Sequence, residues 1–196
     1  MTTPKHEYLR STELVSRHTS RLLLVDVQEK LLPAIPRAEQ LVASCKRMID
    51  GANLVGVPVF ATEQYPKGLG PTAKPLAELI PLRPEKLRFS CAEVLDWGPA
   101  AEQTDSRHQV VVIGMETHVC VLQTSLDLVA LGYQVFVPAD AVASRSEFDW
   151  KFALDRLTNS GVIICTSESV LFEWCEVSGT PEFKQLSQWI KSAPPK

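Results

Sequence analysis

The chain has 196 residues, with 45% hydrophobic and 22% charged side chains and a formal net charge of −3. This composition is typical of a folded globular protein and excludes the disordered, collagen-like and coiled-coil classes. The 20 basic residues are dispersed, so they do not form the positive stripe of a nucleic-acid-binding protein. No apolar run approaches the ~20 residues of a membrane-spanning helix. We therefore expect neither a nucleic-acid nor a membrane partner.

Cysteine usage and the N-terminal sequence indicate the compartment. The five cysteines are an odd number without a C-x-x-C pair, and the first 20 residues are polar and charged. An apolar secretion signal is therefore not expected, and free thiols in a reducing compartment are favoured. We expect a cytoplasmic protein with an N-terminal arm over residues 1–19, one domain over 20–191 and a frayed tail over 192–196.

Short apolar runs alternate with helix-length segments along the chain. The predicted strands cover residues 22–25, 57–61, 87–89, 109–113, 134–137 and 162–165. The first predicted helix begins at residue 36 and ends between residues 51 and 56. The others cover residues 91–103, 117–131 and 146–159, a segment that Thr166 or Ser167 caps, and residues 183–190. Residues 62–75, rich in Pro and Gly, form a long loop of the kind that often carries function. The alternation predicts a parallel sheet with helices on both faces, and ligands bind beyond the carboxyl ends of such strands.

Two residues at predicted strand ends are candidates for catalysis. Asp26 follows the first strand, and it is either a turn residue or a carboxylate placed to accept a proton. The fourth strand leads into GMETHVCV at residues 114–121. With Thr117 as N-cap, Cys120 occupies the third helical position, where free N–H groups and the helix dipole lower the thiol pKa and can hold an oxyanion. A buried structural thiol fits the same position equally well.

The remaining candidates are less specific. His118 lies two residues from Cys120, and residues two apart on a helix point to different faces. We therefore expect the His118 side chain to contact either the substrate or a residue that holds the site together, rather than to act as the base for Cys120. Lys86 precedes a predicted strand, and its pattern alone is that of a solvated surface lysine.

Three motifs occur together and in this order: LLLVDVQ at residues 22–28, Lys86 ahead of Phe89 and Ser90, and GMETHVCV at residues 114–121. As a set they resemble the isochorismatase-like cysteine hydrolases, which include nicotinamidases and N-carbamoylsarcosine amidase. TEQYPKGLGPT at residues 62–72 and ADAVASRS at 139–146 are similar to the branch of isochorismatase domain-containing proteins. The resemblance covers about residues 20–190 and implies a three-layer α/β/α sandwich with a six-stranded parallel sheet of Rossmann-like topology.

The resemblance also implies a catalytic triad of Asp26, Lys86 and Cys120. Asp26 would take the Cys120 proton as general base, and Lys86 would hold the carboxylate and the thiolate by charge. Cys120 would attack a carbonyl to give a thioester, which water would hydrolyse. A cis peptide bond between Met115 and Glu116 would aim the N–H groups of Glu116 and Cys120 at the oxyanion.

Differences between this sequence and other family members limit the reactions that we expect. Metal-dependent nicotinamidases carry an Asp and two His after the second strand, whereas this chain has TEQY at residues 62–65 and no His from 19 to 107. We therefore expect no metal and no cofactor. Cys120, which isochorismatases proper can lack, favours hydrolysis of a small amide, carbamoyl or ester substrate. The candidate substrate-side residues are Gln28, Gln64, Tyr65 and His118.

Two other functions are weighed against hydrolysis. A binding or scaffolding protein of the same fold with little turnover would use the loop at residues 62–75 and the turn at residues 139–146 as a partner or subunit interface. A nucleotide-binding Rossmann protein is poorly supported, because DVQEK follows the first strand in place of a glycine-rich motif. The resemblance implies a homo-oligomer, a dimer or higher. Trp174, Phe183 and Trp189 are either interface anchors or, more simply, residues that pack helices on the sheet.

Overall fold

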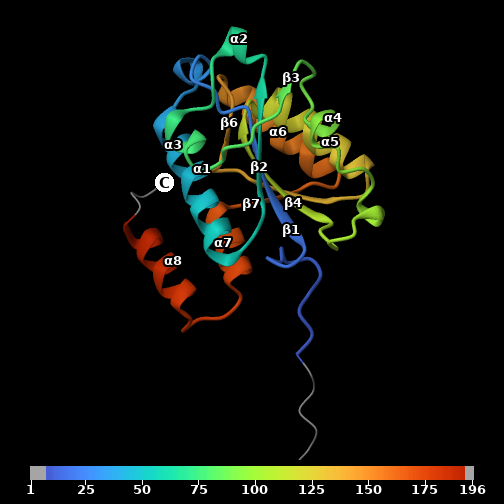
Figure 1. Cartoon of the computed structure of the whole chain (residues 1–196), viewed down its shortest axis with the longest axis vertical. Helices are drawn as coiled ribbons and strands as arrows, with labels where there is room; N and C mark the ends of the chain where they lie inside the picture. Colours follow the sequence, from blue (N-terminus) through green and yellow to red (C-terminus); the bar gives the residue numbers. More distant parts are fainter. Residues whose placement is uncertain (1–7, 193–196) are drawn as a thin grey trace, which may run out of the picture.

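The computed structural model describes residues 8–192, which form a parallel sheet between two layers of helices (Figure 1). Six strands lie in the order β3-β2-β1-β4-β5-β7, and a further two-residue strand pairs with β4. Every one of these pairings is parallel. The strands are β1 (Ser20–Val25), β2 (Val59–Gln64), β3 (Glu85–Lys86), β4 (Gln109–Met115), β5 (Gln134–Pro138), β6 (Val142–Ala143) and β7 (Ile163–Cys165). The predicted three-layer α/β class is confirmed.

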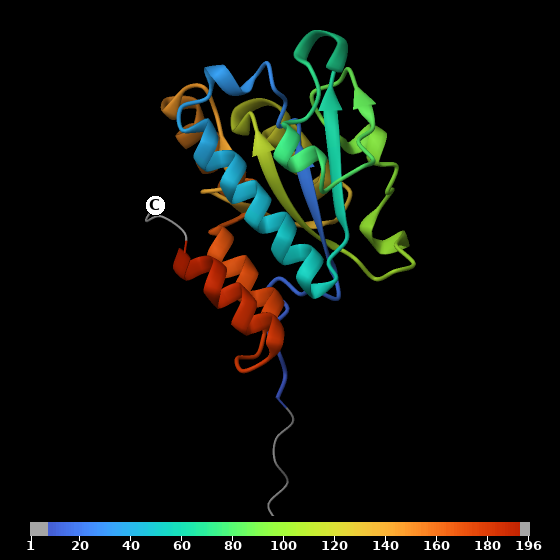
Figure 2. The ribbon, with the colours of Figure 1, turned by 60° about the vertical axis from the view of Figure 1, so that its left-hand side comes forward.

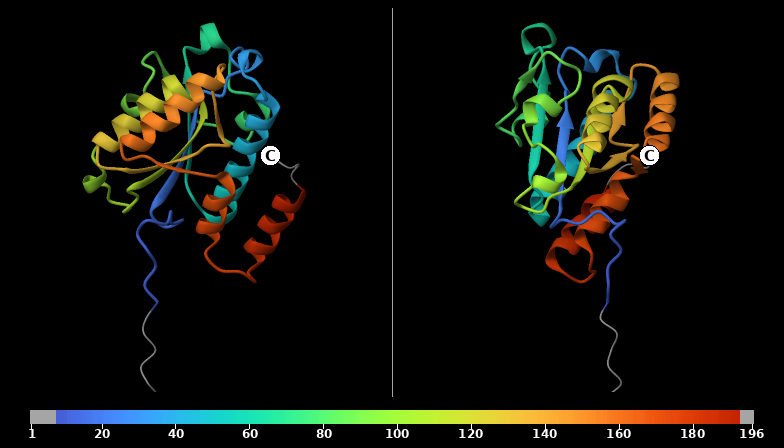
Figure 3. Two further views of the ribbon diagram at one scale, coloured as in Figure 1. Left: turned by 180° about the vertical axis from the view of Figure 1, so that it is seen from behind. Right: turned by 90° about the vertical axis from the view of Figure 1, so that its right-hand side faces the viewer.

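Helices cover both faces of the sheet (Figures 2 and 3). One layer contains α1 (Ala38–Val55), α3 (Lys74–Ala77), α7 (Ser167–Cys175) and α8 (Pro181–Ser192). The other layer contains α4 (Ala92–Leu95), α5 (Leu122–Ala130) and α6 (Glu147–Asn159). The short helix α2 (Pro66–Leu69) follows β2 at the carboxyl edge of the sheet.

The central strand β1 is apolar throughout because both of its faces are covered. Leu22 and Leu24 pack into the core beneath α1 and α7, whereas Leu23 and Val25 pack into the core beneath α5 and α6. All four side chains are fully buried, and burial of each contributes about 1.5–3 kcal/mol. This apolar body fixes the position of the carboxyl edge, where the candidate site lies.

Side-chain caps fix the starts of two predicted helices. Ser146 Oγ accepts a hydrogen bond from the Asp149 amide at the start of α6. Thr166 and Ser169 form a reciprocal capping box at the start of α7. The sequence predicted both helix starts because the cap residues directly precede the apolar helical pattern.

Other predicted elements differ from the observed ones. The third strand is Glu85–Lys86 rather than 87–89, because the Lys86 side chain is buried while Leu87 and Phe89 are exposed. The helix predicted for 91–103 is divided into α4 and a 3-10 turn at Ala100–Glu102, since Asp96 adopts a left-handed conformation and Pro99 is extended.

Two boundaries around the first helix and the second strand also differ. Helix α1 begins at Ala38 rather than at Pro36, because Arg37 has a left-handed backbone with φ 58°. The loop predicted from residue 62 is shorter, since β2 continues to Gln64 and helices α2 and α3 occupy much of the remainder.

The C-terminal helices α7 and α8 pack on α1 and on each other. Trp174 is fully buried, and its indole N–H donates to Ser20 Oγ at 2.9 Å, which favours the packing interpretation of this residue. The predicted frayed tail, beyond its first residue, lies outside the described residues, as does the start of the predicted N-terminal arm. Among residues 8–192, no helix is both long and apolar enough to cross a membrane.

Candidate active site

Asp26 lies where three neighbouring strands end. Val25 is paired with Thr62 of β2 on one side and with Gly114 of β4 on the other. A Cβ atom on Gly114 would lie 2.2 Å from the Val25 carbonyl oxygen, and Gly114 has φ +119°, so this close approach requires glycine. Asp26 itself turns the chain away from the sheet with φ 49°. The carboxylate is thereby placed beside the turn that carries Cys120.

The carboxylate of Asp26 and the ammonium of Lys86 form a buried ion pair. Lys86 Nζ lies 2.6 Å from Asp26 Oδ2, and the two side chains are 1% and 0% exposed. Nζ also donates to Gln64 Oε1 at 2.7 Å and to the Phe89 carbonyl at 2.8 Å. An ammonium has three protons, so protein oxygens take all of them. Lys86 Nζ therefore has no proton left to donate to a substrate.

The second oxygen of Asp26 is held from β2. Thr62 Oγ1 donates to Asp26 Oδ1 at 2.8 Å and lies 3.2 Å from Cys91 Sγ. Because the single hydroxyl proton of Thr62 goes to the carboxylate, the Cys91 thiol donates to Thr62. Thr62 and Gln64 are alternate residues of one strand and point to the same face. One face of β2 thus holds both members of the ion pair.

Sequence reasoning missed the roles of Thr62 and Cys91 and treated Gln64 as a substrate-side residue. The available signal was the pair of polar residues two apart at the end of β2. That spacing predicts a shared face, but it does not identify the residues that the face meets.

Cys120 lies in a π-helical turn, Thr117–Val121, which leads directly into α5. The predicted cap is displaced by one residue: Glu116, with φ −86° and ψ 142°, holds the N-cap position, and Thr117 is already helical. Cys120 is consequently the fourth residue of the turn rather than the third. Within the described residues, Thr117 Oγ1 is buried without a hydrogen-bond partner, so Thr117 does not cap the helix.

The predicted lowering of the Cys120 pKa is wrong. Burial and the negative charge of Asp26 raise the pKa of Cys120, and the positive charge of Lys86 opposes them only in part. A full carboxylate charge and desolvation outweigh the fractional charge of a helix terminus. The resting thiol is therefore protonated. A reaction at Cys120 must remove this proton, and Asp26 is placed to accept it.

The peptide bond between Met115 and Glu116 is cis. The Glu116 side chain accepts a hydrogen bond from the Arg145 amide at 3.1 Å, which joins this turn to the segment after β6. The N–H groups of Glu116 and Cys120 belong to the N-cap and the first turn, where a helix leaves amides without intrahelical acceptors. Their role as oxyanion donors stays a prediction.

The four candidate substrate-side residues have different environments. Gln28 is fully buried, and its side-chain amide forms hydrogen bonds with the backbone of Gln64 and Gly70. It therefore links the segment after β1 to the end of β2 and to the loop after α2. Tyr65 is half exposed beside α2. His118 Nδ1 lies 3.0 Å from Ser144 Oγ, which agrees with the expectation that the imidazole is not the base for Cys120. Tyr65 and His118 remain candidates for substrate contact.

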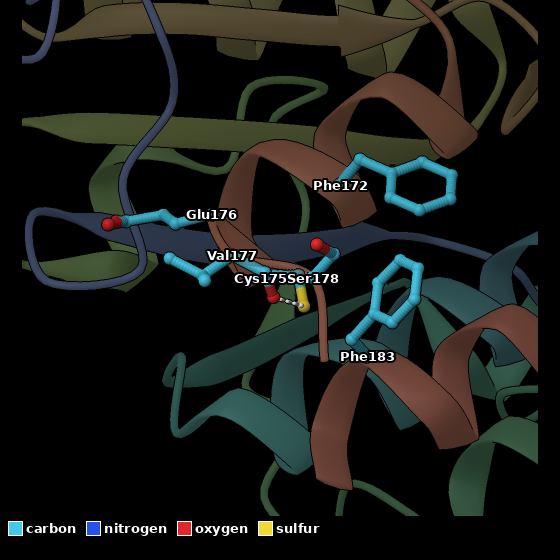
Figure 4. Close-up of a pocket in the computed structure, with 6 residues that line it drawn as sticks. All are labelled: Phe172, Cys175, Glu176, Val177, Ser178 and Phe183. Atoms are coloured by element: carbon cyan, nitrogen blue, oxygen red, sulfur yellow. Dashed lines mark hydrogen bonds between the residues drawn. The ribbon is translucent and has the colours of Figure 1, made fainter. Parts of the chain in front are cut away.

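A separate cavity lies between α7 and α8 (Figure 4), at the end of the molecule away from α2 (Figure 1). Its volume is about 320 Å³, and its lining consists of Phe172, Cys175, Glu176, Val177, Ser178 and Phe183. Cys175 Sγ donates to the Val177 carbonyl, and no acid–lysine pair accompanies it here. In the described part of the chain, no group of three or more His, Cys, Asp or Glu side chains is placed to hold a metal ion.

This parallel α/β sandwich, with its polar cluster at the carboxyl edge, is an isochorismatase-like hydrolase fold, as comparison with known proteins shows. The family model described as "Isochorismatase domain" matches residues 20–169. The chain therefore belongs to the isochorismatase family. Isochorismatase domain-containing protein 1 of Danio rerio is 39% identical over 185 residues, and the match covers 92% of this chain. The chain spans only 64% of that relative's length.

Solved structures agree with the family assignment. The structure of MAR1 ribonuclease from Caenorhabditis elegans has a TM-score of 0.83 and 34% identity, and the match covers 93% of this chain and 95% of that one. The ycaC gene product of Escherichia coli, described as an octameric hydrolase of unknown specificity, has a TM-score of 0.74 over 94% of this chain and 99% of its own. At 20% identity, the second likeness concerns the fold alone.

Proposed function

We propose that this protein is a cysteine hydrolase that cleaves a small amide, carbamoyl or ester substrate through a thioester on Cys120. The observation that carries this proposal is the buried ion pair of Asp26 and Lys86, whose two charges both act on the thiol of Cys120. Burial of two charges is costly, and ionisable groups that are desolvated beside a nucleophile are typical of catalytic sites. The family's hydrolase fold supports the same reaction class.

The geometry supports a stepwise mechanism. Asp26 accepts the Cys120 proton as the sulfur attacks the carbonyl carbon, because its carboxylate is near enough to raise the pKa of the thiol. Lys86 keeps a positive charge beside the thiolate as that charge develops. The N–H groups of Glu116 and Cys120 then stabilise the oxyanion. Protonated Asp26 gives the proton to the leaving group as its bond to the carbonyl carbon breaks. When water attacks the thioester, Asp26 accepts a proton from the water, the C–S bond breaks to release the acid, and the proton returns to the Cys120 sulfur.

The C. elegans neighbour is named a ribonuclease, and RNA cleavage is therefore the competing hydrolytic reaction. A phosphodiester substrate favours cationic groups that are free to meet its phosphates. In this chain Lys86 is buried and fully hydrogen-bonded, and the net charge is −3. These features favour a small neutral carbonyl compound over RNA.

The experiment is a turnover screen against small amides, N-carbamoyl compounds and esters, with an RNA oligonucleotide as a separate arm. Wild-type protein should hydrolyse at least one carbonyl compound, and Cys120→Ala should not. Cys175→Ser is the matched control, because this thiol lies in the distant cavity. Wild-type turnover by Cys120→Ala would contradict the proposal, and cleavage of RNA alone would favour the competing reaction.

The scaffolding alternative predicts a different outcome from the same screen. A protein that only binds would show no Cys120-dependent turnover across the panel, while retaining its fold. The specific polar contacts around Asp26 and Lys86 favour catalysis, since a binding surface in the loop at residues 62–75 would not need a buried charge pair.

We further propose that the chain works as a homo-oligomer in a reducing compartment such as the cytoplasm. All five cysteines are free thiols, which supports a reducing environment. The octameric E. coli neighbour supports self-association within this fold.

A further inference from the structure

The outer face of helix α6 carries two exposed phenylalanines. Phe148 and Phe152 are 70% and 54% exposed, and their ring centroids lie 4.5 Å apart. The opposite face of α6 packs against α5, β7 and the turn that holds Cys120, and α6 lies along the outside of its layer (Figure 3). Adjacent exposed aromatic rings on an ordered helix are typical of an interface rather than of a solvated surface.

Charged side chains flank the two rings in a particular order. At ~100° per residue, Lys151 and Asp155 lie on one side of the rings, and Asp149 and Arg156 lie on the other. Among the described residues, none of these four side chains forms an ion pair. Each flank thus offers one positive and one negative charge to a partner.

The charges on the outer face of α6 are complementary to those on the same face of a second copy. When two α6 helices meet antiparallel across a two-fold axis near Phe152, residues whose numbers add to about 305 face each other. Lys151 then faces Asp155 of the second copy, and Arg156 faces Asp149 of the second copy. The phenylalanines of both copies meet at the centre. All four basic groups of the pair gain acidic partners without any change in the fold.

We propose that α6 is a self-association surface on which two copies of this chain pair antiparallel around Phe152. The proposal names the surface for the homo-oligomer proposed above and is independent of the catalytic assignment. Because the inner face of α6 packs against the turn of Cys120, the paired helices would support the nucleophile of each copy from behind.

The test is charge reversal with the full-length protein, measured by sedimentation velocity over a concentration series. Lys151→Glu and Asp155→Lys each place like charges opposite each other at two symmetric points, so each should weaken self-association at least tenfold. The double variant restores opposite charges and should recover it. An equimolar mixture of the two single variants should form a heterodimer.

Controls separate folding from pairing. Phe152→Asp should abolish pairing and keep the wild-type far-ultraviolet circular dichroism spectrum, since the side chain contacts solvent in one copy. Single variants that associate as tightly as wild type, or a double variant that fails to recover association, would overturn the assignment of this surface while self-association itself stood. A monomeric wild-type protein at all concentrations would overturn both, and turnover by that monomer would leave the proposed hydrolase function in place.

Discussion

The two ends of strand β1 each carry a charged cluster, and the clusters are built differently. Near the amino end, Arg21 contacts Asp105 at 2.9 Å and lies 4.8 Å above the ring of Trp97. Asp105 is 47% exposed, so solvent reaches this pair. Beyond the carboxyl end, Asp26 and Lys86 are almost completely buried.

The two clusters also differ in the groups that lie beside them. Burial opposes the effect of Arg21 on Asp105, but hydrogen bonds from Arg21 and the Arg107 amide lower the pKa of that carboxyl. This pair joins a surface loop to the sheet. The Asp26–Lys86 pair instead acts on a reactive group, because Asp26 raises the pKa of the Cys120 thiol and Lys86 lowers it. A charged pair in a sheet therefore indicates a site only when a reactive group shares its desolvated environment.

The largest effect should come from removal of the sulfur at the carboxyl end. Cys120→Ala should lower turnover of a substrate found in the screen by at least about 10⁴-fold, the scale of nucleophile removal in other enzymes. Its melting temperature should change little, because alanine fills most of the same space. Enzyme kinetics together with thermal unfolding measure both quantities. A retained rate would refute nucleophilic catalysis by Cys120.

Removing the basic residue of each charged pair should lower the free energy of unfolding by different amounts. Lys86→Met leaves the Asp26 carboxylate buried without its cation and should lower the free energy of unfolding by ~3–5 kcal/mol. Arg21→Met leaves Asp105 partly solvated and should cost only ~1–2 kcal/mol. Urea unfolding of the two variants measures both values. Equal losses would show that the two clusters are energetically alike.

The titration of Cys120 should respond to its neighbours in opposite directions. Since Asp26 raises the thiol pKa and Lys86 lowers it, Asp26→Asn should move the pH midpoint of Cys120 alkylation down by at least about one unit. Lys86→Met should move it up. Acrylamide labelling across pH, with mass spectrometry of the Cys120 peptide, gives the midpoint. A midpoint that stays unchanged in Asp26→Asn would show that the carboxylate does not control the thiol.

The smallest effect should come from the hydroxyl that holds Asp26. Thr62→Val removes the 2.8 Å hydrogen bond to Asp26 Oδ1 and should lower kcat about tenfold with KM unchanged, since a hydrogen bond to a charged group contributes ~1.5–3 kcal/mol. Thr62→Ser keeps the hydroxyl and should restore the rate. If serine fails to restore it, the residue acts through packing rather than through its hydrogen bond.

Most of the sheet could be predicted from the sequence because β1, β4 and β5 are apolar runs with clear turns after them. The starts of helices α6 and α7 could also be predicted, since Ser146 and Thr166 are of residue types that cap helices. The sequence pattern predicts the third strand at the wrong residues, because a lysine is normally exposed and nothing in the local sequence indicates that Lys86 is buried. Only the contacts of Lys86 across the sheet explain its burial.

The site was predictable in its strand-end residues but not in its electrostatics. Asp26 and Cys120 follow strands directly, so topology brings them to one edge. The bond between Thr62 and Cys91 joins residues 29 apart, and no local pattern predicts it. Burial likewise depends on the whole fold: it raises the pKa of Cys91 to about 11 and reverses the expectation for Cys120.

The central claim is that Cys120 becomes acylated during turnover, and intact-mass analysis of the protein during hydrolysis tests it most directly. Wild-type protein and the Cys175→Ser control should gain the mass of the acyl group, and peptide mapping should locate it on Cys120. Cys120→Ala should gain no such mass. An acyl group found on another residue, or unimpaired hydrolysis by Cys120→Ala, would contradict the account.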